Sequence, residues 1–118
     1  MAHNIELGRR GEQVAAEHLE ARGMRVVDRN WRCRHGEIDL VLRDGSVLVF
    51  VEVKTRTGVR YGHPFESITP VKLARLRRLA LAWCDAHERS AAGLRIDAVA
   101  VHAPADAPAI VEHLEGVG

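Results

Sequence analysis

The chain has 118 residues, of which 47% are apolar and 28% are charged. This length corresponds to a single domain, residues 1–118, which can bury a core without disulfide or metal cross-links. The composition excludes collagen-like, mucin-like and wholly disordered chains. There is no run of about 18 apolar residues, the first residues lack the apolar stretch of a secretory signal, and the two cysteines lie far apart. We therefore expect a cytoplasmic protein with no membrane partner.

The basic side chains are concentrated in the first two thirds of the chain. The net charge is +1, but residues 9–78 carry +6, from 15 basic and 9 acidic side chains, and residues 79–118 carry −4. This asymmetry favours a negatively charged partner for residues 9–78. Lys54 and Lys72 are the only lysines among 17 basic residues. A lysine in an arginine-rich chain can mark a position that needs a compact ammonium group.

Two segments have the apolar spacing of amphipathic helices. Residues 4–22 form the first, and a glycine directly after them supplies the stop. Residues 70–87 form the second, with Ser67 or Thr69 as its N-terminal cap and Pro70 at its first position.

The other regular segments have the patterns of β-strands. The turn signal Asp44-Gly45 joins two of them into a hairpin, whose second arm is apolar enough to be central in its sheet. Residues 30–35 and 56–66 are expected to be a connection and a loop, and the last glycines are expected to fray. The sequence therefore predicts an α/β fold with a central mixed sheet flanked by helices, in the order α-β-β-β-α-β, with or without a final edge strand. The expected strands are residues 24–29, 37–43, 46–55, 94–102 and, at the edge, 110–114.

The hairpin gathers charged side chains on one face. An even-length turn pairs residues whose numbers add to an odd value, so Asp39 faces Glu52 or lies one step away from that position. Residues two apart share a face, which places Glu37 and Lys54 beside them. Three carboxylates and one ammonium on otherwise apolar strands are unfavourable unless a partner compensates the charge.

A divalent cation is a natural partner for these carboxylates. Asp39 and Glu52 offer the hard oxygen ligands that Mg²⁺ or Mn²⁺ takes together with water and substrate phosphates. Lys54 would lie beside the metal, where it can orient or deprotonate a water for attack on phosphorus and offset the developing charge. The alternative is a solvent-exposed hairpin face with an ordinary Glu-Lys pair.

The sequence around these residues resembles a known superfamily. GEIDLV followed by VFVEVKTR is similar to the active-site hairpin of the restriction-endonuclease-like, or PD-(D/E)xK, superfamily, and Asp39, Glu52 and Lys54 match its pattern with a gap of 12 residues. Over residues 8–101 the chain also resembles the small bacterial YraN-type proteins, through GRRGEQVAAEHLEARG, NWRCRHGEIDLV, FVEVKTR, TPVK and RIDAV. Ile38, in place of the superfamily's proline, departs from the pattern.

The resemblance implies a nuclease-like fold and one further site residue. It implies a central mixed sheet flanked by helices and a relation to archaeal Holliday-junction resolvases, in which an acidic residue of the first helix joins the site. Glu12 occupies that place. Gly8 and Gly11 beside it each cost about 1 kcal/mol relative to alanine inside a helix, which indicates a packing or close-approach role. The alternative for Glu12 is an ordinary surface position.

Basic side chains outside the hairpin are candidates for binding nucleic acid. Tyr61 and His63 could stack on a base, and the basic residues near them could hold phosphates. The basic residues of the second helix recur at three-residue spacing. This spacing suits contact with a phosphate backbone; the alternative is a plain solvent-facing surface. Glu37 either supports the metal ligands or lies at the exposed end of a strand, and Asp97 is compensated by Arg95 or by the site. The basic candidates are Arg56 and Arg60 in the loop, and Lys72, Arg75 and Arg78 in the helix.

These observations together predict a Mg²⁺- or Mn²⁺-dependent endonuclease that hydrolyses DNA. No sequence-reading helix or finger is recognisable, so we expect structure-directed recognition of branched or duplex DNA. Two-fold pairing would match a two-fold junction, which favours a homodimer. Two alternatives stay open: a non-catalytic nucleic-acid-binding or partner-recruiting module with a nuclease-like fold, and an enzyme that cleaves RNA or a nucleotide.

Overall fold

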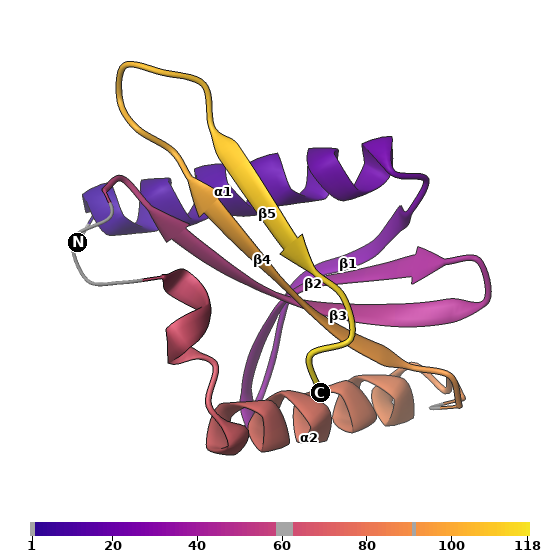
Figure 1. Cartoon of the computed structure of the whole chain (residues 1–118). Helices are drawn as coiled ribbons and strands as arrows, with labels where there is room; N and C mark the ends of the chain where they lie inside the picture. The colour runs from indigo at the N-terminus through magenta and orange to yellow at the C-terminus, as the bar shows by residue number, and fades with distance from the viewer. Residues whose placement is uncertain (1, 59–62, 91) are drawn as a thin grey trace.

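A five-stranded mixed sheet lies between two helices (Figure 1). The computed structural model describes residues 2–58, 63–90 and 92–118. The strands follow the order β1-β2-β3-β4-β5 across the sheet; β3 and β4 are parallel, and the other neighbouring strands pair antiparallel. This arrangement confirms the predicted mixed α/β class and element order, including the final edge strand. The elements are α1 (Ala2–Ala21), β1 (Arg25–Cys33), β2 (Gly36–Asp44), β3 (Val47–Arg56), the 3-10 helix η1 (Pro64–Ser67), α2 (Pro70–Ala86), β4 (Arg95–His102) and β5 (Ile110–Leu114).

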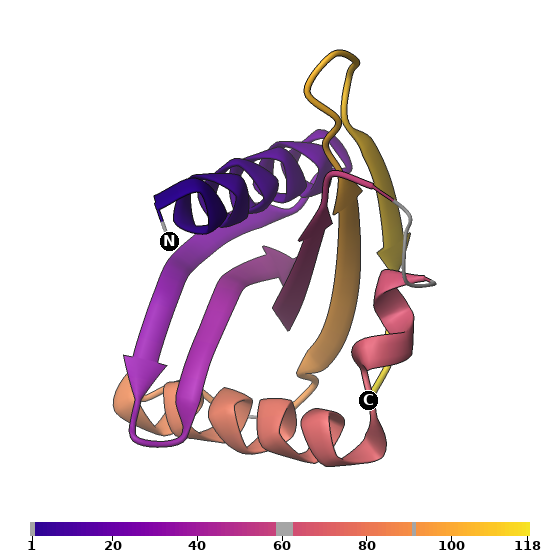
Figure 2. The same ribbon diagram turned by 90° about the vertical axis from the view of Figure 1, so that its left-hand side faces the viewer.

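The two long helices cover opposite faces of the sheet, α1 above it and α2 below it in Figures 1 and 2. Side chains alternate between the two faces along β3, because successive residues of a strand point in opposite directions. Val49 and Val51 join the buried cluster under α1, while Leu48 and Phe50 join the cluster over α2. The central, doubly covered position predicted for this strand is therefore confirmed. None of the helices in the described part of the chain combines the length and hydropathy needed to span a bilayer.

β1 is longer than the sequence indicates. We expected a strand over residues 24–29 followed by a connection over 30–35, but β1 continues to Cys33 and pairs with β2, as in Trp31 opposite Ile38. Trp31 and Cys33 pack against the cluster over α2, while Asn30 and Arg32, at the alternate positions, are polar. The expectation of a connection was wrong. The segment is short and rich in arginine, so the alternation of polar and apolar residues that is typical of a strand was not recognised there.

The C-terminal residues are tied to the sheet, although we expected them to fray. The backbone N–H of Gly116 donates to the Asp97 carboxylate at 3.0 Å, and that of Val117 donates to the backbone of β4 at 2.8 Å. Asp97 is fully buried, accepts two hydrogen bonds from Arg95 at 2.9 and 3.0 Å, and lies 2.8 Å from His113 Nε2. Of the two alternatives left open for Asp97, compensation by Arg95 is the one observed, and the buried carboxylate holds β5 and the C-terminal segment against β4.

α1 approaches β3 very closely at Gly11. A Cβ placed on Gly11 would lie 1.8 Å from Oγ1 of Thr55 and 2.8 Å from its Cβ, so the helix can occupy this position only with glycine there. A Cβ on Gly8 would have nothing within 4 Å. The predicted close approach is thus confirmed for Gly11 and not for Gly8. Its consequence is that Glu12, the next residue of α1, is brought down to the sheet.

We expect Gly11→Ala to lower the free energy of unfolding by roughly 1–3 kcal/mol, because the added methyl group overlaps Thr55 and forces α1 away from β3. Gly8→Ala is the matched control in the same helix, and it should be neutral or stabilising by up to about 1 kcal/mol, since alanine is the better helix former. Urea unfolding followed by circular dichroism measures both. Equal stabilities for the two variants would contradict the close packing of α1 on β3.

Candidate functional site

The candidate site lies where β2 separates from β3. Their pairing ends at Leu40 opposite Val51, although β2 begins four residues earlier and continues there along β1 alone. The numbers of paired residues add to an odd value, as predicted, and the next pair in this register would be Asp39 opposite Glu52. Asp39 Oδ2 instead accepts a hydrogen bond of 2.8 Å from the backbone N–H of Val53. A side-chain carboxylate therefore satisfies a backbone donor of β3 beyond the last paired residue of β2.

Three carboxylates from two elements meet at this point. Glu12 of α1 and Glu37 and Asp39 of β2 each bring an oxygen atom within 4.8 Å of the others, and all three residues are half-buried. Asn30 Nδ2 donates a hydrogen bond of 2.8 Å to Glu12, and Arg32 Nε donates to Glu37. Asn30 has a positive φ of 49°, a conformation that asparagine tolerates better than most residues. Two of the three carboxylates are thus oriented by side chains of β1.

This group of oxygens fits a small divalent cation. Oxygens bound to one Mg²⁺ at about 2.1 Å lie no more than about 4.2 Å apart, so small side-chain adjustments would complete the ligand set. A donor set of carboxylates alone favours Mg²⁺ or Mn²⁺ over softer metals. Glu37, which the sequence left open, lies inside the group, as does Glu12. Glu52, expected as a metal ligand beside Asp39, is not one of its three members.

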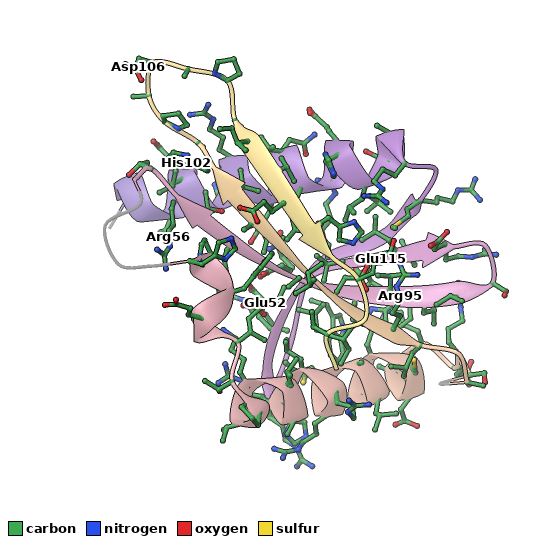
Figure 3. All side chains as sticks on the ribbon, in the orientation of Figure 1. Glu52, Arg56, Arg95, His102, Asp106 and Glu115 are labelled. Atoms are coloured by element: carbon green, nitrogen blue, oxygen red, sulfur yellow. The ribbon has the colours of Figure 1, made fainter. Side chains whose placement is uncertain are left out.

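Glu52 is held by both lysines of the chain. Its Oε1 lies 3.4 Å from Nζ of Lys54 and 3.0 Å from Nζ of Lys72, and its side chain is only 12% exposed. Lys72 belongs to α2, so this contact joins the helix to the sheet, and Figure 3 shows Glu52 on the side of the sheet that faces α2. We expected Lys72 on one exposed face with Arg75 and Arg78. Those two arginines are exposed, whereas Lys72 is half-buried against Glu52.

The crowding of charges changes the acidity of the site. Burial, followed by the negative charge of Glu52, raises the pKa of Asp39 from an ordinary 3.8 to about 7, and the hydrogen bond from Val53 acts against this rise. Burial, and then the neighbouring Lys72, lowers the pKa of Lys54. Although burial acts in the opposite direction, hydrogen bonds with Lys54 and Glu52 raise the pKa of Lys72. Lys54 is therefore the lysine that gives up its proton more readily.

A groove opens beside the three carboxylates, between α1 and β1. Its basic members, Arg9, Arg29 and Arg32, come from parts of the chain where the sequence analysis assigned no ligand-binding role. Arg29 is held in place by a hydrogen bond of 2.8 Å to Gln13 of α1. The concentration of arginine in residues 9–34 was the available signal, and it was missed because β1 was not recognised at full length. The groove is lined by Ile5, Gly8, Arg9, Glu12, Asn30, Arg32 and Glu37, and its continuation by Gln13, Arg29 and Leu40.

The predicted loop residues are described in part. Arg56 and His63 line a second pocket, between η1 and the ends of β4 and β5, and the ring of His63 lies 2.9 Å from the Glu112 carboxylate. Figure 3 shows Arg56 at the η1 side of the sheet. Arg60 and Tyr61 fall outside the described residues. The structure therefore places one of the two predicted loop arginines on the same strand as Glu52 and Lys54.

The fold and the site define a small α/β protein with a carboxylate and lysine centre at the separation of two central strands. Residues 11–101 match the family described as "Uncharacterised protein family UPF0102". A UPF0102 protein of Arthrobacter sp. is 58% identical over 112 residues, 95% of both chains, and one of Renibacterium salmoninarum is 55% identical over 118 residues, the whole of both chains. A UPF0102 protein of Frankia alni is 54% identical over 110 residues, 93% of this chain and 92% of the relative. The chain belongs to the UPF0102 family, the YraN-like family that its sequence resembles.

We expect Asp39→Asn to stabilise the metal-free protein at pH 8 by roughly 2–4 kcal/mol. The folded-state pKa of about 7 exceeds the unfolded value of about 3.8, so the wild type loses stability as the pH rises from about 4 to about 7. Asparagine keeps an oxygen for the Val53 N–H and carries no charge. The difference in unfolding free energy, from urea titrations in a chelator, should be near zero at pH 4 and level off above pH 7. A less stable Asp39→Asn protein at pH 8 would contradict this charge crowding.

Proposed function

We propose that this chain is a divalent-metal-dependent endonuclease that hydrolyses DNA phosphodiesters, and that it belongs to the restriction-endonuclease-like superfamily. The observation that carries the proposal is the position of Glu12, Glu37 and Asp39 beside the Glu52 and Lys54 pair. The mixed sheet flanked by helices and the Asp39, Glu52-x-Lys54 pattern on adjacent strands support the superfamily assignment. Exposed acidic groups alone would not support it, but an orienting partner for each of the three carboxylates does.

In this proposal each side chain has a separate task. Asp39, Glu12 and Glu37 would hold the cation, and Glu52, kept beside Lys54, would add an oxygen to its shell. Mg²⁺ or Mn²⁺ bound there would neutralise charge on the scissile phosphate and lower the pKa of a coordinated water. Lys54 orients the attacking water and can accept its proton, which its lowered pKa favours. Metal binding and proton transfer thus take place side by side, because the carboxylate of Glu52 and the ammonium of Lys54 are two residues apart on β3.

The surroundings of the site favour a phosphate-rich partner. The groove between α1 and β1 carries Arg9, Arg29 and Arg32 beside the carboxylates, and α2 carries exposed arginines that follow Lys72 in the sequence. Basic side chains around the metal ligands would favour contact with a nucleic acid backbone. We propose branched or duplex DNA as this partner, a homodimer as the form that would match a two-fold junction, and the cytoplasm as the location.

The test of the activity is a cleavage panel. We expect Mg²⁺- or Mn²⁺-dependent cutting of at least one labelled substrate among single strand, duplex, flap, four-way junction and RNA, and a fall of about 10²- to 10⁴-fold in Lys54→Ala. Arg89→Ala is the control, because it removes one exposed cation outside the site. Undiminished cutting by Lys54→Ala would overturn the role of Lys54. Binding without cutting under either metal would favour the non-catalytic module. Cutting of RNA alone would show that the substrate is RNA and not DNA.

The groove has its own test, made with the Asp39→Asn protein so that cleavage does not interfere. We expect Arg9→Ala to weaken duplex binding and to reduce the slope of log K against log salt by about 1, because one phosphate contact is lost. Arg10→Ala is the matched control, since Arg10 is exposed on the same helix and does not line the groove. Fluorescence anisotropy at several salt concentrations measures both. Equal slopes for the two variants would remove the groove from the binding surface.

A further inference from the structure

Both lysines of this arginine-rich chain contact a single carboxylate. The ammonium groups of Lys54 and Lys72 lie 3.4 and 3.0 Å from the same oxygen, Oε1 of Glu52. The side chains of the three residues are between 12% and 29% exposed, so solvent screens these contacts less than it screens surface ion pairs. The two positions that depart from arginine are thus the two that face Glu52.

The position of Lys72 in α2 is locally unfavourable. Thr69 caps the helix by accepting a hydrogen bond of 3.2 Å from the backbone N–H of Lys72, and Pro70 is the first helical residue. Lys72 is therefore in the first turn, where the helix dipole disfavours a cation and favours an acidic residue. The first turn of α2 has no acidic residue. The carboxylate of Glu52, from another element, supplies the negative charge that this ammonium needs.

Contact with a phosphate backbone does not account for this arrangement. Arg75 and Arg78 follow at the same spacing along α2 and are exposed, as a backbone-binding face requires. The ammonium of Lys72, by contrast, contacts Glu52, and the Lys72 side chain is only 20% exposed. Arginine, which occupies most basic positions of this chain, has a broad planar head, whereas two compact ammonium groups can share one carboxylate oxygen.

We propose that Lys72 is a positioning residue of the metal centre: together with Lys54 it holds Oε1 of Glu52, and its charge competes with a divalent cation for that carboxylate. This inference rests on the proposed function, because it takes the group of Glu12, Glu37 and Asp39 as the place where the cation binds. With Lys72 in place, Glu52 has a fixed orientation and is compensated before any cation arrives. The cation therefore binds more weakly than four neighbouring carboxylates alone would allow, and Glu52 stays beside Lys54.

Mn²⁺ titration by calorimetry tests the competition without any need for activity. We expect Lys72→Met, which keeps the length of the side chain, to bind Mn²⁺ about three- to tenfold more tightly than the wild type, because one nearby positive charge is gone. Lys72→Arg keeps the charge and should bind as the wild type does. Arg75→Ala is the matched control: it removes the same charge one turn further along α2 and should change Mn²⁺ affinity less than twofold.

The effect must pass through Glu52. In a Glu52→Gln background, Lys72→Met should no longer tighten Mn²⁺ binding, since the carboxylate for which the two cations compete is absent. On the substrate that the wild type cuts, Lys72→Met should lower kcat and leave KM within about twofold, whereas loss of a phosphate contact would raise KM. Thermal unfolding of each variant confirms that it is folded.

The outcomes separate the two proposals. If the wild type binds Mn²⁺ and Lys72→Met binds it no more tightly than Arg75→Ala does, the role of Lys72 is overturned and the metal site stands. A raised KM with unchanged kcat would also overturn it, in favour of a phosphate contact. Failure of the wild type to bind Mn²⁺ at millimolar concentration would overturn the proposed function, and this inference with it.

Discussion

The separation of β2 from β3 is the constraint on which the site depends. A continuous hairpin would use the backbone donors of β3 for the sheet, and its two arms would leave no room for side chains between them. Pairing stops at Leu40 and Val51, and Asp39 then serves as the hydrogen-bond partner of Val53. The same carboxylate is fixed in position by that bond and remains within reach of Glu12 and Glu37. A break in the sheet thus becomes the place where charged groups from several elements meet.

The two apolar layers make this concentration of charge tolerable. The cluster under α1 fixes the helix that carries Glu12, and the cluster over α2 fixes the helix that carries Lys72. Gly11 allows the first of these helices to lie directly on Thr55. Burial of hydrophobic side chains on both faces offsets the cost of the desolvation and the charge repulsion that raise the pKa of Asp39, so the protein retains a locally unfavourable arrangement. Such an arrangement is stable only while both helices stay packed.

Most of the hairpin could be predicted, and the reasons are local. The Asp44-Gly45 turn sets the parity of the register, and Gly45 adopts the positive φ of 62° that such a turn requires. The run of residues 47–51 in β3 is apolar at every position, which indicates that both faces of the strand are buried there. The edge strand β5 was predicted with its observed bounds. β1 was predicted too short, since its outer face is polar over the residues that pair with the start of β2.

The sequence by itself determined the element order, the two faces of the hairpin and the closeness of Asp39, Glu52 and Lys54, because these follow from turn length and side-chain alternation within about 20 residues. Only the tertiary structure decided that Lys72 joins them, and Glu12 was expected there from the resemblance to known proteins and not from any pattern within this sequence. Lys72 follows Glu52 by 20 positions and Glu12 precedes Asp39 by 27, and no periodicity relates them. Their places depend on how closely α1 and α2 pack on the two faces of the sheet. That packing is set by the fit of many side chains at once, so it cannot be read from any single segment.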